Sequence, residues 1–309
     1  MLPKKVLLAY DGTTPSRKAT AYLNQVFGHR EDFEITVCVI ARKPPSHLLQ
    51  AGGGHSFLER EELLEKAIAE NLAQAQKVAQ RGRELLAAFP EKSVDLRVCL
   101  QTGDLAYEII RTAESGRYDA IVVGRRGLSR TTQGFMGSVS YKLAGHALCP
   151  VWMISGKSWN HRVLVAVDLG DPGFRVVEHV AFIFSGDPKV EITLFHVVYP
   201  WTGPGPRTET LKEMEKHLIA SAAEEARVFF EKAREYFEKN GFPAERARVR
   251  IVRSLFGPAS AILKEARRGH YGTVVVGRRG RGGFRGLLLG SVSTKIISTL
   301  KDRAVWLVG

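Results

Sequence analysis

Two kinds of hydrophobic pattern alternate along the chain. Short runs of consecutive apolar residues, such as VLLAY at 6–10 and the β-branched run in EITVCVI at 34–40, predict buried strands. Longer stretches in which apolar residues recur at helical spacing, as at 57–88 and 209–240, predict helices. Because strands that alternate with helices form parallel sheets covered on both faces, the pattern predicts an α/β fold.

Motifs of the first half reappear in the second half in the same order. VVGRRG begins at Val122 and again at Val275, and GSVS begins at Gly137 and at Gly290, with the same separation. Near the start of each half, KVLLAYDG matches RVLVAVDLG. A repeat of this length indicates a duplicated unit. We therefore expect two tandem doubly wound domains, at 1–156 and 157–309. Each should hold an open, mostly parallel five-stranded sheet flanked by four helices.

A glycine-rich loop follows the fourth predicted strand of each half. In both copies a Gly-x-x-Gly pair is followed, after nine residues, by Gly-Ser at the start of a helix. Glycines let the backbone approach a bulky anion, and the free amides of a helix N-terminus attract phosphate. A strand-to-helix turn capped by its serine is the alternative, but two copies with identical spacing favour phosphate binding. The candidate residues are Gly124, Gly127, Gly137 and Ser138, with Gly277, Gly280, Gly290 and Ser291.

An aspartate ends the first predicted strand of each half, Asp11 in the first and Asp168 in the second. In parallel sheets ligands bind beyond the carboxyl ends of the strands, where a carboxylate accepts hydrogen bonds from ribose hydroxyls or a base. A helix cap or a turn explains the same residue type, and a cap would be duplicated as well. The repeat therefore favours a binding role for these aspartates only in part.

The charge balance narrows the class of ligand. The net charge of +13 attracts anions, whether phosphates of a small ligand, nucleic acid or an acidic membrane surface. The three cysteines lack metal-ligand spacing and suit a reducing compartment. No apolar run approaches the roughly 20 residues that a membrane helix needs, and the N-terminal apolar stretch is too short for a signal peptide. We expect a cytoplasmic protein without a metal site or a membrane partner.

The combined pattern resembles the ATP-binding type of the universal stress protein family, over essentially the whole chain. It consists of the Gly-x-x-Gly-(nine residues)-Gly-Ser loop, an early strand ending in Asp, and a second strand ending in a His-Val-like pair. The resemblance implies ATP, ADP or AMP as ligand, with or without Mg²⁺, and phosphate contacts from the loop residues above. It implies adenosine contacts from Asp11 and Asp168, and backbone contacts to adenine at Ile40 and Val197. It also places two further glycines near the ligand, Gly103 and Gly257.

The same resemblance carries expectations about assembly. Family members usually pair through their last strands, so PVWMIS and AVWLVG are expected to pair within the chain as an intramolecular pseudo-dimer, and a homodimer is the alternative. Trp152 and Trp306 occupy matching positions in these strands, and we expect them in the core. The sequence departs from the family pattern at Cys38-Val39-Ile40, where the second half keeps Phe195-His196-Val197, and in the paired arginines of both loops.

Two other functions were weighed against nucleotide binding with a regulatory or stress-related role. The first is an enzyme, but the GxxxxGK[ST] loop of P-loop ATPases does not occur, and His146 and His196 are isolated. Slow ATP hydrolysis, or autophosphorylation at Ser138 or Ser291, stays a hypothesis. Nucleic-acid binding through the stretch RRGRGGFRG is the second. The repeat already accounts for that loop and aromatic residues are not interleaved along it, so we rank it below small-nucleotide binding.

Overall fold

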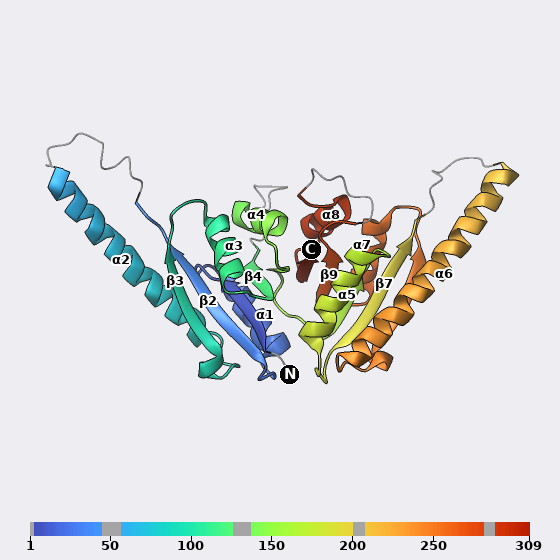
Figure 1. Ribbon diagram of the computed structural model, residues 1–309, viewed down its shortest axis with the longest axis horizontal. Coiled ribbons are helices and arrows are strands. Elements are labelled where there is room, and N and C mark those ends of the chain that lie inside the picture. The colour runs from blue at the N-terminus through green and yellow to red at the C-terminus, as the bar shows by residue number, and fades with distance from the viewer. Residues whose placement is uncertain (1–2, 45–56, 126–136, 200–207, 281–287) are drawn as a thin grey trace. The chain divides into compact units, whose positions relative to one another are not determined.

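The fold comes from a computed structural model that describes residues 3–44, 57–125, 137–199, 208–280 and 288–309 (Figure 1). Helices and strands alternate along these residues, as the hydrophobic pattern predicts. The chain divides into two compact units: Met1–Arg126 with Gly137–Cys149 belong to the first, and Pro150–Gly309 belong to the second.

The first unit is built on four parallel strands in the order β3-β2-β1-β4. Its helices are linked in two pairs. Asn24 on α1 donates from Nδ2 to the Leu85 carbonyl oxygen, just after α2, at 2.6 Å. Lys142 on α4 forms an ion pair with Asp104 at the start of α3. The elements are β1 (Lys4–Ala9), α1 (Thr14–Phe27), β2 (Phe33–Ala41), α2 (Phe57–Glu84), β3 (Val94–Leu100), α3 (Leu105–Ser115), β4 (Ala120–Gly124) and α4 (Ser138–His146), with a 3₁₀ turn at Glu91–Ser93.

The second unit has six described strands in the order β5-β10-β9-β6-β7-β8, parallel except where β5 meets β10. The fifth strand of the first repeat therefore belongs to this compact unit. The elements are β5 (Val151–Ile154), β6 (Arg162–Ala166), α5 (Asp171–Phe184), β7 (Glu191–Val198), α6 (Glu209–Lys239), β8 (Ala247–Arg253), α7 (Pro258–Arg268), β9 (Thr273–Gly277), α8 (Ser291–Thr299) and β10 (Ala304–Val308), with a 3₁₀ turn at Ala244–Arg246.

The expected pairing of the two last strands is present. β5 and β10 run antiparallel, with Trp152 opposite Trp306 in the register. The two indole rings are fully buried and stack with centroids 3.9 Å apart and planes 4° from parallel. His179 on α5 receives the Trp152 indole N–H at Nε2, 3.1 Å away. Both tryptophans are therefore core residues, as expected from the sequence.

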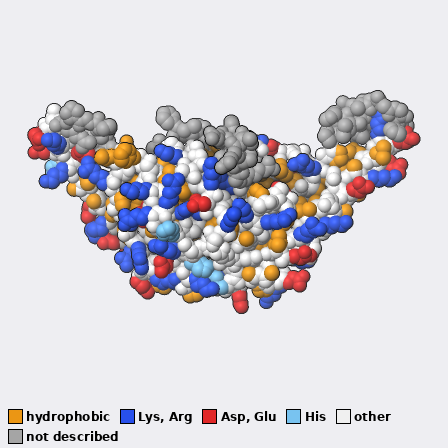
Figure 2. All heavy atoms as spheres, turned by 180° about the vertical axis from the view of Figure 1, so that it is seen from behind, with side chains coloured by type: hydrophobic (Ala, Val, Ile, Leu, Met, Phe, Trp, Pro, Cys, Tyr) orange, Lys and Arg blue, Asp and Glu red, His pale blue; other side chains and the backbone are white. Residues whose placement is uncertain are grey.

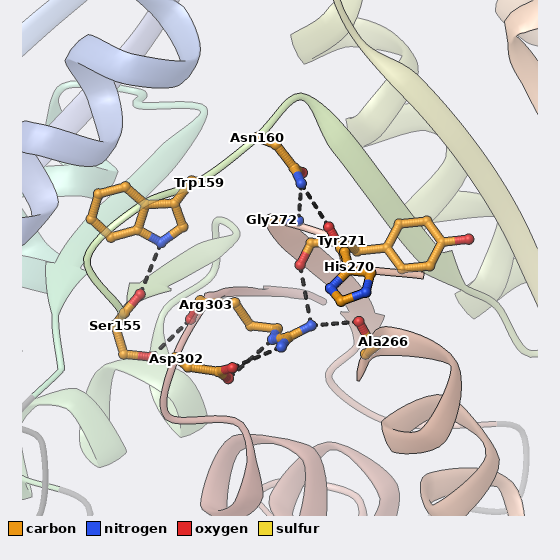
Figure 3. A network of polar contacts seen from close by, with 9 residues as sticks. All are labelled: Ser155, Trp159, Asn160, Ala266, His270, Tyr271, Gly272, Asp302 and Arg303. Carbon is orange, nitrogen blue, oxygen red and sulfur yellow. Dashed lines mark hydrogen bonds and ion pairs between the residues drawn. The ribbon is translucent and has the colours of Figure 1, made fainter. Parts of the chain in front are cut away.

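The segment that joins the two repeats is fixed to the second unit by polar contacts (Figure 3). The Ser155 hydroxyl donates to the Arg303 carbonyl oxygen at 2.8 Å, and the Trp159 indole donates to the Ser155 carbonyl oxygen at 2.8 Å. Asn160 receives the Gly272 amide at 2.9 Å. Because these bonds join residues 155–160 to the residue before β9 and to the loop before β10, the segment is part of the second unit.

A buried ionic cluster supports the first strand of the first unit. Lys4 and Arg30 are almost fully buried, and both form ion pairs with the carboxylate of Asp32. The two cations hold the pKa of Asp32 below its usual value, against the opposing effect of burial. Removing one partner from such a cluster leaves an uncompensated buried charge, which is strongly destabilising.

Helix ends differ slightly from the prediction. α2 ends at Glu84 rather than Ala88, because the Leu86 amide bonds to the carbonyl of Arg83 and tightens the chain out of the α-helical pattern. α6 ends at Lys239, one residue before the predicted end. The α/β class and the doubly wound, mostly parallel arrangement are confirmed.

Candidate functional site

A cavity of about 370 Å³ opens in the second unit, at the carboxyl ends of β6, β7 and β9. Its volume lies within the range of roughly 300–1,000 Å³ that is typical of small-molecule sites. The three strands are parallel, so the residues at their ends meet at one edge of the sheet. The sequence-predicted residues that line it are Asp168, Val197, Gly277, Gly280, Gly290 and Ser291.

The acidic end of the cavity depends on two glycines. Asp168 follows β6, and a Cβ placed on Gly280 would lie 2.9 Å from its carboxylate oxygen Oδ2. A Cβ on Gly173, in the first turn of α5, would lie only 1.6 Å from the Asp168 carbonyl oxygen. No side chain larger than hydrogen fits at Gly173, so this glycine lets α5 approach the end of β6. Gly173 lies outside the glycine motifs of the sequence and joins the site only through this contact.

The N-terminus of α8 also lines the cavity. Gly290 is its N-cap, with backbone in the extended region, and this residue has no side chain that could cap the helix. The Gly290 amide bonds to the Arg278 carbonyl oxygen at 2.9 Å, and the Ser293 hydroxyl donates to the same oxygen at 2.9 Å. Ser291 is the first helical residue and not the cap, so the alternative of a serine-capped turn is wrong for this loop. The positive end of the helix dipole faces the cavity wall.

The paired arginines of the second loop have different environments. Arg278 is buried, and its guanidinium lies about 3.5 Å from the position of a Cβ on Gly309. Arg279 is exposed and lines the cavity. One positive side chain of the pair is therefore available at the cavity and the other is part of the packing. In the first loop, Arg125 is likewise buried, and burial lowers its pKa to about 10.

A histidine that the sequence left unassigned also lines the cavity. His196 in β7 is buried, and its Nδ1 lies 3.0 Å from the Val167 carbonyl oxygen. A carbonyl only accepts hydrogen bonds, so Nδ1 must carry the proton. In the neutral ring Nε2 then has a lone pair and acts as an acceptor. The signal for this residue was its place directly before Val197 at the end of a strand.

Gly257 lies beside the cavity but does not line it. It is the N-cap of α7, with φ +82°, a conformation that favours glycine, and the next residue, Pro258, lines the cavity. A Cβ on Gly257 would meet nothing within 4 Å. The backbone conformation rather than close packing therefore accounts for glycine at this position.

In the first unit, the strands that carry the predicted residues are also parallel. Asp11 follows β1, and its carboxylate accepts from both the amide and the hydroxyl of Thr13, at 3.0 and 2.6 Å. A turn is one of the roles that the sequence allows for this aspartate. In the second unit Gly170 occupies the position of Thr13 and offers no hydroxyl. The two aspartates therefore have different local partners.

The remaining first-half residues lie on the same sheet or its loops. Ile40 lies near the end of β2, and Gly103 follows β3, where its carbonyl oxygen receives the Gln101 side-chain amide at 2.8 Å. A Cβ on Gly124 at the end of β4 would lie 2.1 Å from the Pro15 carbonyl oxygen, so the close approach of α1 requires glycine there. Gly127 lies outside the described residues.

Gly137 and Ser138 reproduce the arrangement seen at α8. Gly137 is the N-cap of α4 without a side-chain cap, and Ser138 is the first helical residue. A Cβ on Gly137 would meet nothing within 4 Å, and its φ is negative, so the described surroundings do not require glycine. The described part of the chain contains no cluster of three His, Cys, Asp or Glu side chains that would hold a metal ion.

Charged side chains of both signs occur together on the face shown in Figure 2. Lys and Arg total 45 against 32 Asp and Glu. On the face shown in Figure 2, basic side chains are distributed widely, and acidic side chains lie among them. None of the described helices combines the length and apolar character that crossing a membrane requires.

Comparisons with known proteins agree with this architecture. A universal stress protein of Mycolicibacterium smegmatis is 32% identical over 184 residues, which are 57% of this chain and 57% of that protein. One from Mycobacterium bovis is 25% identical over 318 residues, covering 95% of this chain and 92% of the relative. The crystal structure of a universal stress protein from Archaeoglobus fulgidus, at 23% identity, superposes with a TM-score of 0.63 and covers 98% of this chain and 97% of that one, which shows a shared fold.

The repeat itself also matches a known family. The family model described as the universal stress protein family matches residues 3–155 and again residues 160–301. The two matches follow the internal duplication and together span most of the chain. This chain therefore belongs to the universal stress protein family and contains two copies of its domain in tandem.

Proposed function

We propose that the chain binds an adenine nucleotide, ATP in the first instance, in the cavity of its second half. The observation that carries the proposal is the mixture of groups that line that cavity. The α8 N-terminus and Arg279 favour an anion. Asp168 and His196 line the same cavity and present hydrogen-bond acceptors. A nucleotide carries the complementary groups, which are its phosphates and its hydroxyl and amino donors.

Each predicted residue has a role in this proposal. The phosphates lie against the amides of the glycine loop and of the first turn of α8, with Ser291 as an additional donor. Asp168 accepts from the ribose hydroxyls, and the backbone at Val197 contacts adenine. Mg²⁺, where present, is held by the phosphates and water, as is usual for this cation. The described lining residues include a single carboxylate, Asp168.

We propose the same ligand for the first half, through Asp11, Ile40, Gly103, Gly124, Gly127, Gly137 and Ser138. The Thr13 hydroxyl bonded to Asp11 has no counterpart at Gly170, and we infer that the halves bind with unequal affinity. We further infer a stress-related regulatory role in the cytoplasm with little or no catalysis. In that role the repeats act together as an intramolecular pseudo-dimer.

Equilibrium binding of ATP tests the proposal. Isothermal titration of the purified chain, preceded by mass spectrometry of any nucleotide that co-purifies, gives the ligand and the number bound per chain. The single variants Gly137→Val and Gly290→Val assign each binding event to its half, and the double variant should retain no ATP. The proposal is wrong if the wild-type chain binds no adenine nucleotide, or if the folded double variant binds ATP as tightly as the wild type.

A further inference from the structure

We propose that Nε2 of His196 accepts a hydrogen bond from the 6-amino group of the bound base, and so makes the second-half site selective for adenine over 6-oxo purines. The inference rests on the proposed function and deepens it. It starts from the position of the ring, which lines the cavity with only 9% of the residue exposed.

The hydrogen bond to the protein fixes which nitrogen is left for a ligand. Nδ1 donates to the Val167 carbonyl oxygen at 3.0 Å, so the second nitrogen is the acceptor. Within the described residues, this is the hydrogen bond that the ring makes. Because the residue lines the cavity and Nδ1 is used by Val167, Nε2 is the ring nitrogen left for a ligand.

The chemistry of the ligand then identifies the donor. A nucleotide carries hydrogen-bond donors of two kinds, the ribose hydroxyls and the exocyclic amine of adenine. Asp168, beside Gly280, takes the hydroxyls in the proposed arrangement. The amine is left for His196, whose neighbour Val197 is the residue expected beside the base. A 6-oxo purine presents an acceptor at the same place, and two facing acceptors repel.

The first half lacks this feature. Val39 occupies the position of His196, between Cys38 and Ile40 in β2. Valine offers no acceptor, so any base selectivity from this position belongs to the second half alone. The two repeats would then differ in which purine nucleotide they accept as well as in affinity.

Competition between ATP and ITP, measured by titration on the full-length chain, tests the assignment. The variant His196→Asn keeps a donor near the Nδ1 position and removes the acceptor at Nε2, whereas His196→Gln keeps an oxygen near the Nε2 position. The exposed His217 on α6 supplies the control His217→Asn. We expect His196→Asn to narrow the preference for ATP over ITP about tenfold, with His196→Gln retaining most of it and His217→Asn all of it.

Several results would overturn the assignment. If His196→Asn keeps the wild-type preference for ATP over ITP, the contact between Nε2 and the base is excluded. If the variant binds both nucleotides more weakly by the same factor, the ring only supports the strand. If the preference for ATP over dATP falls instead, the acceptor serves the ribose. A wild-type chain that binds neither triphosphate refutes the proposed function itself, which is a distinct outcome.

Discussion

The variant Gly290→Val distinguishes the role of this glycine in ligand binding from its role in folding. Gly290 has φ −68° and ψ 155°, a conformation open to any residue. A Cβ there would meet its nearest neighbour, the Arg278 carbonyl oxygen, at 3.4 Å, which is ordinary contact. Valine is a poorer N-cap than glycine, and we expect the variant to lose roughly 1 kcal/mol of folding free energy. The fold should therefore survive the change.

The effect on binding should be larger. The Gly290 amide is already bonded to Arg278, so a phosphate at this helix accepts from the amides that follow, beginning with Ser291. A hydrogen bond to a charged group contributes roughly 1.5–3 kcal/mol. If the isopropyl group displaces the phosphate from one such amide, the affinity of the second site for ATP should fall about 10- to 150-fold.

Titration calorimetry with ATP, combined with urea unfolding, measures both effects in one preparation. Gly173→Ala is the matched contrast, because a Cβ there would overlap the Asp168 carbonyl oxygen at 1.6 Å. That variant should lose at least roughly 1–3 kcal/mol of folding free energy. The reasoning is refuted if Gly290→Val is folded and binds ATP as tightly as the wild type at the second site.

Three further predictions concern stability and reactivity. Asp32→Ala removes the carboxylate that pairs with two buried cations and should lower the free energy of unfolding by roughly 3–5 kcal/mol in urea titrations. Glu62→Ala, at an exposed helical ion pair, should change it by less than about 0.5 kcal/mol, and equal effects of the two variants would contradict this. Desolvation lowers the pKa of His179 to about 3, so folding stability should decline as the pH falls from about 6.5 toward 3, because the unfolded state takes up the proton first. The folding stability of His179→Gln should decline less over this pH range. A decline parallel to that of the wild type would show that His179 does not cause the pH dependence. A hydrogen bond from Cys38 is the main influence that lowers the pKa of Cys99 to about 5. The rate at which iodoacetamide alkylates Cys99, followed by peptide mass spectrometry, should therefore stay nearly constant from pH 9 to 6. A tenfold fall in that rate per pH unit within the range would disprove the lowered pKa.

Much of the fold could be predicted because local sequence patterns determine where its strands and helices form. The apolar runs mark β1, β2, β6 and β9 to within a few residues, and the repeat shows that both halves share one order of elements. The pairing of β5 with β10 was expected from the family resemblance, and the repeat located Trp152 and Trp306 at equivalent positions in the two strands. Helix ends were less certain, as at α2, because single hydrogen bonds decide where a helix stops.

The site could be predicted as a set of positions but not as a set of contacts. The end of each strand located Asp168, Val197 and Gly277 at one sheet edge. The sequence does not reveal which way a side chain turns, so the difference between buried Arg278 and exposed Arg279 was not foreseen.

Close contacts were likewise hidden from the sequence. Glycine is needed at 173 because α5 comes close to the Asp168 carbonyl in the loop before it, and Nδ1 of His196 is used by the Val167 carbonyl, 29 residues earlier. The residue types alone indicate neither contact.

A structure of the chain in complex with a non-hydrolysable ATP analogue tests the central claim most directly. We predict the phosphates within hydrogen-bond distance of the Ser291 amide at the start of α8, and the nucleoside between Asp168 and Val197 in the second-half cavity. A nucleotide bound elsewhere on the second unit, or an α8 N-terminus that stays without a phosphate at saturating analogue, would contradict it.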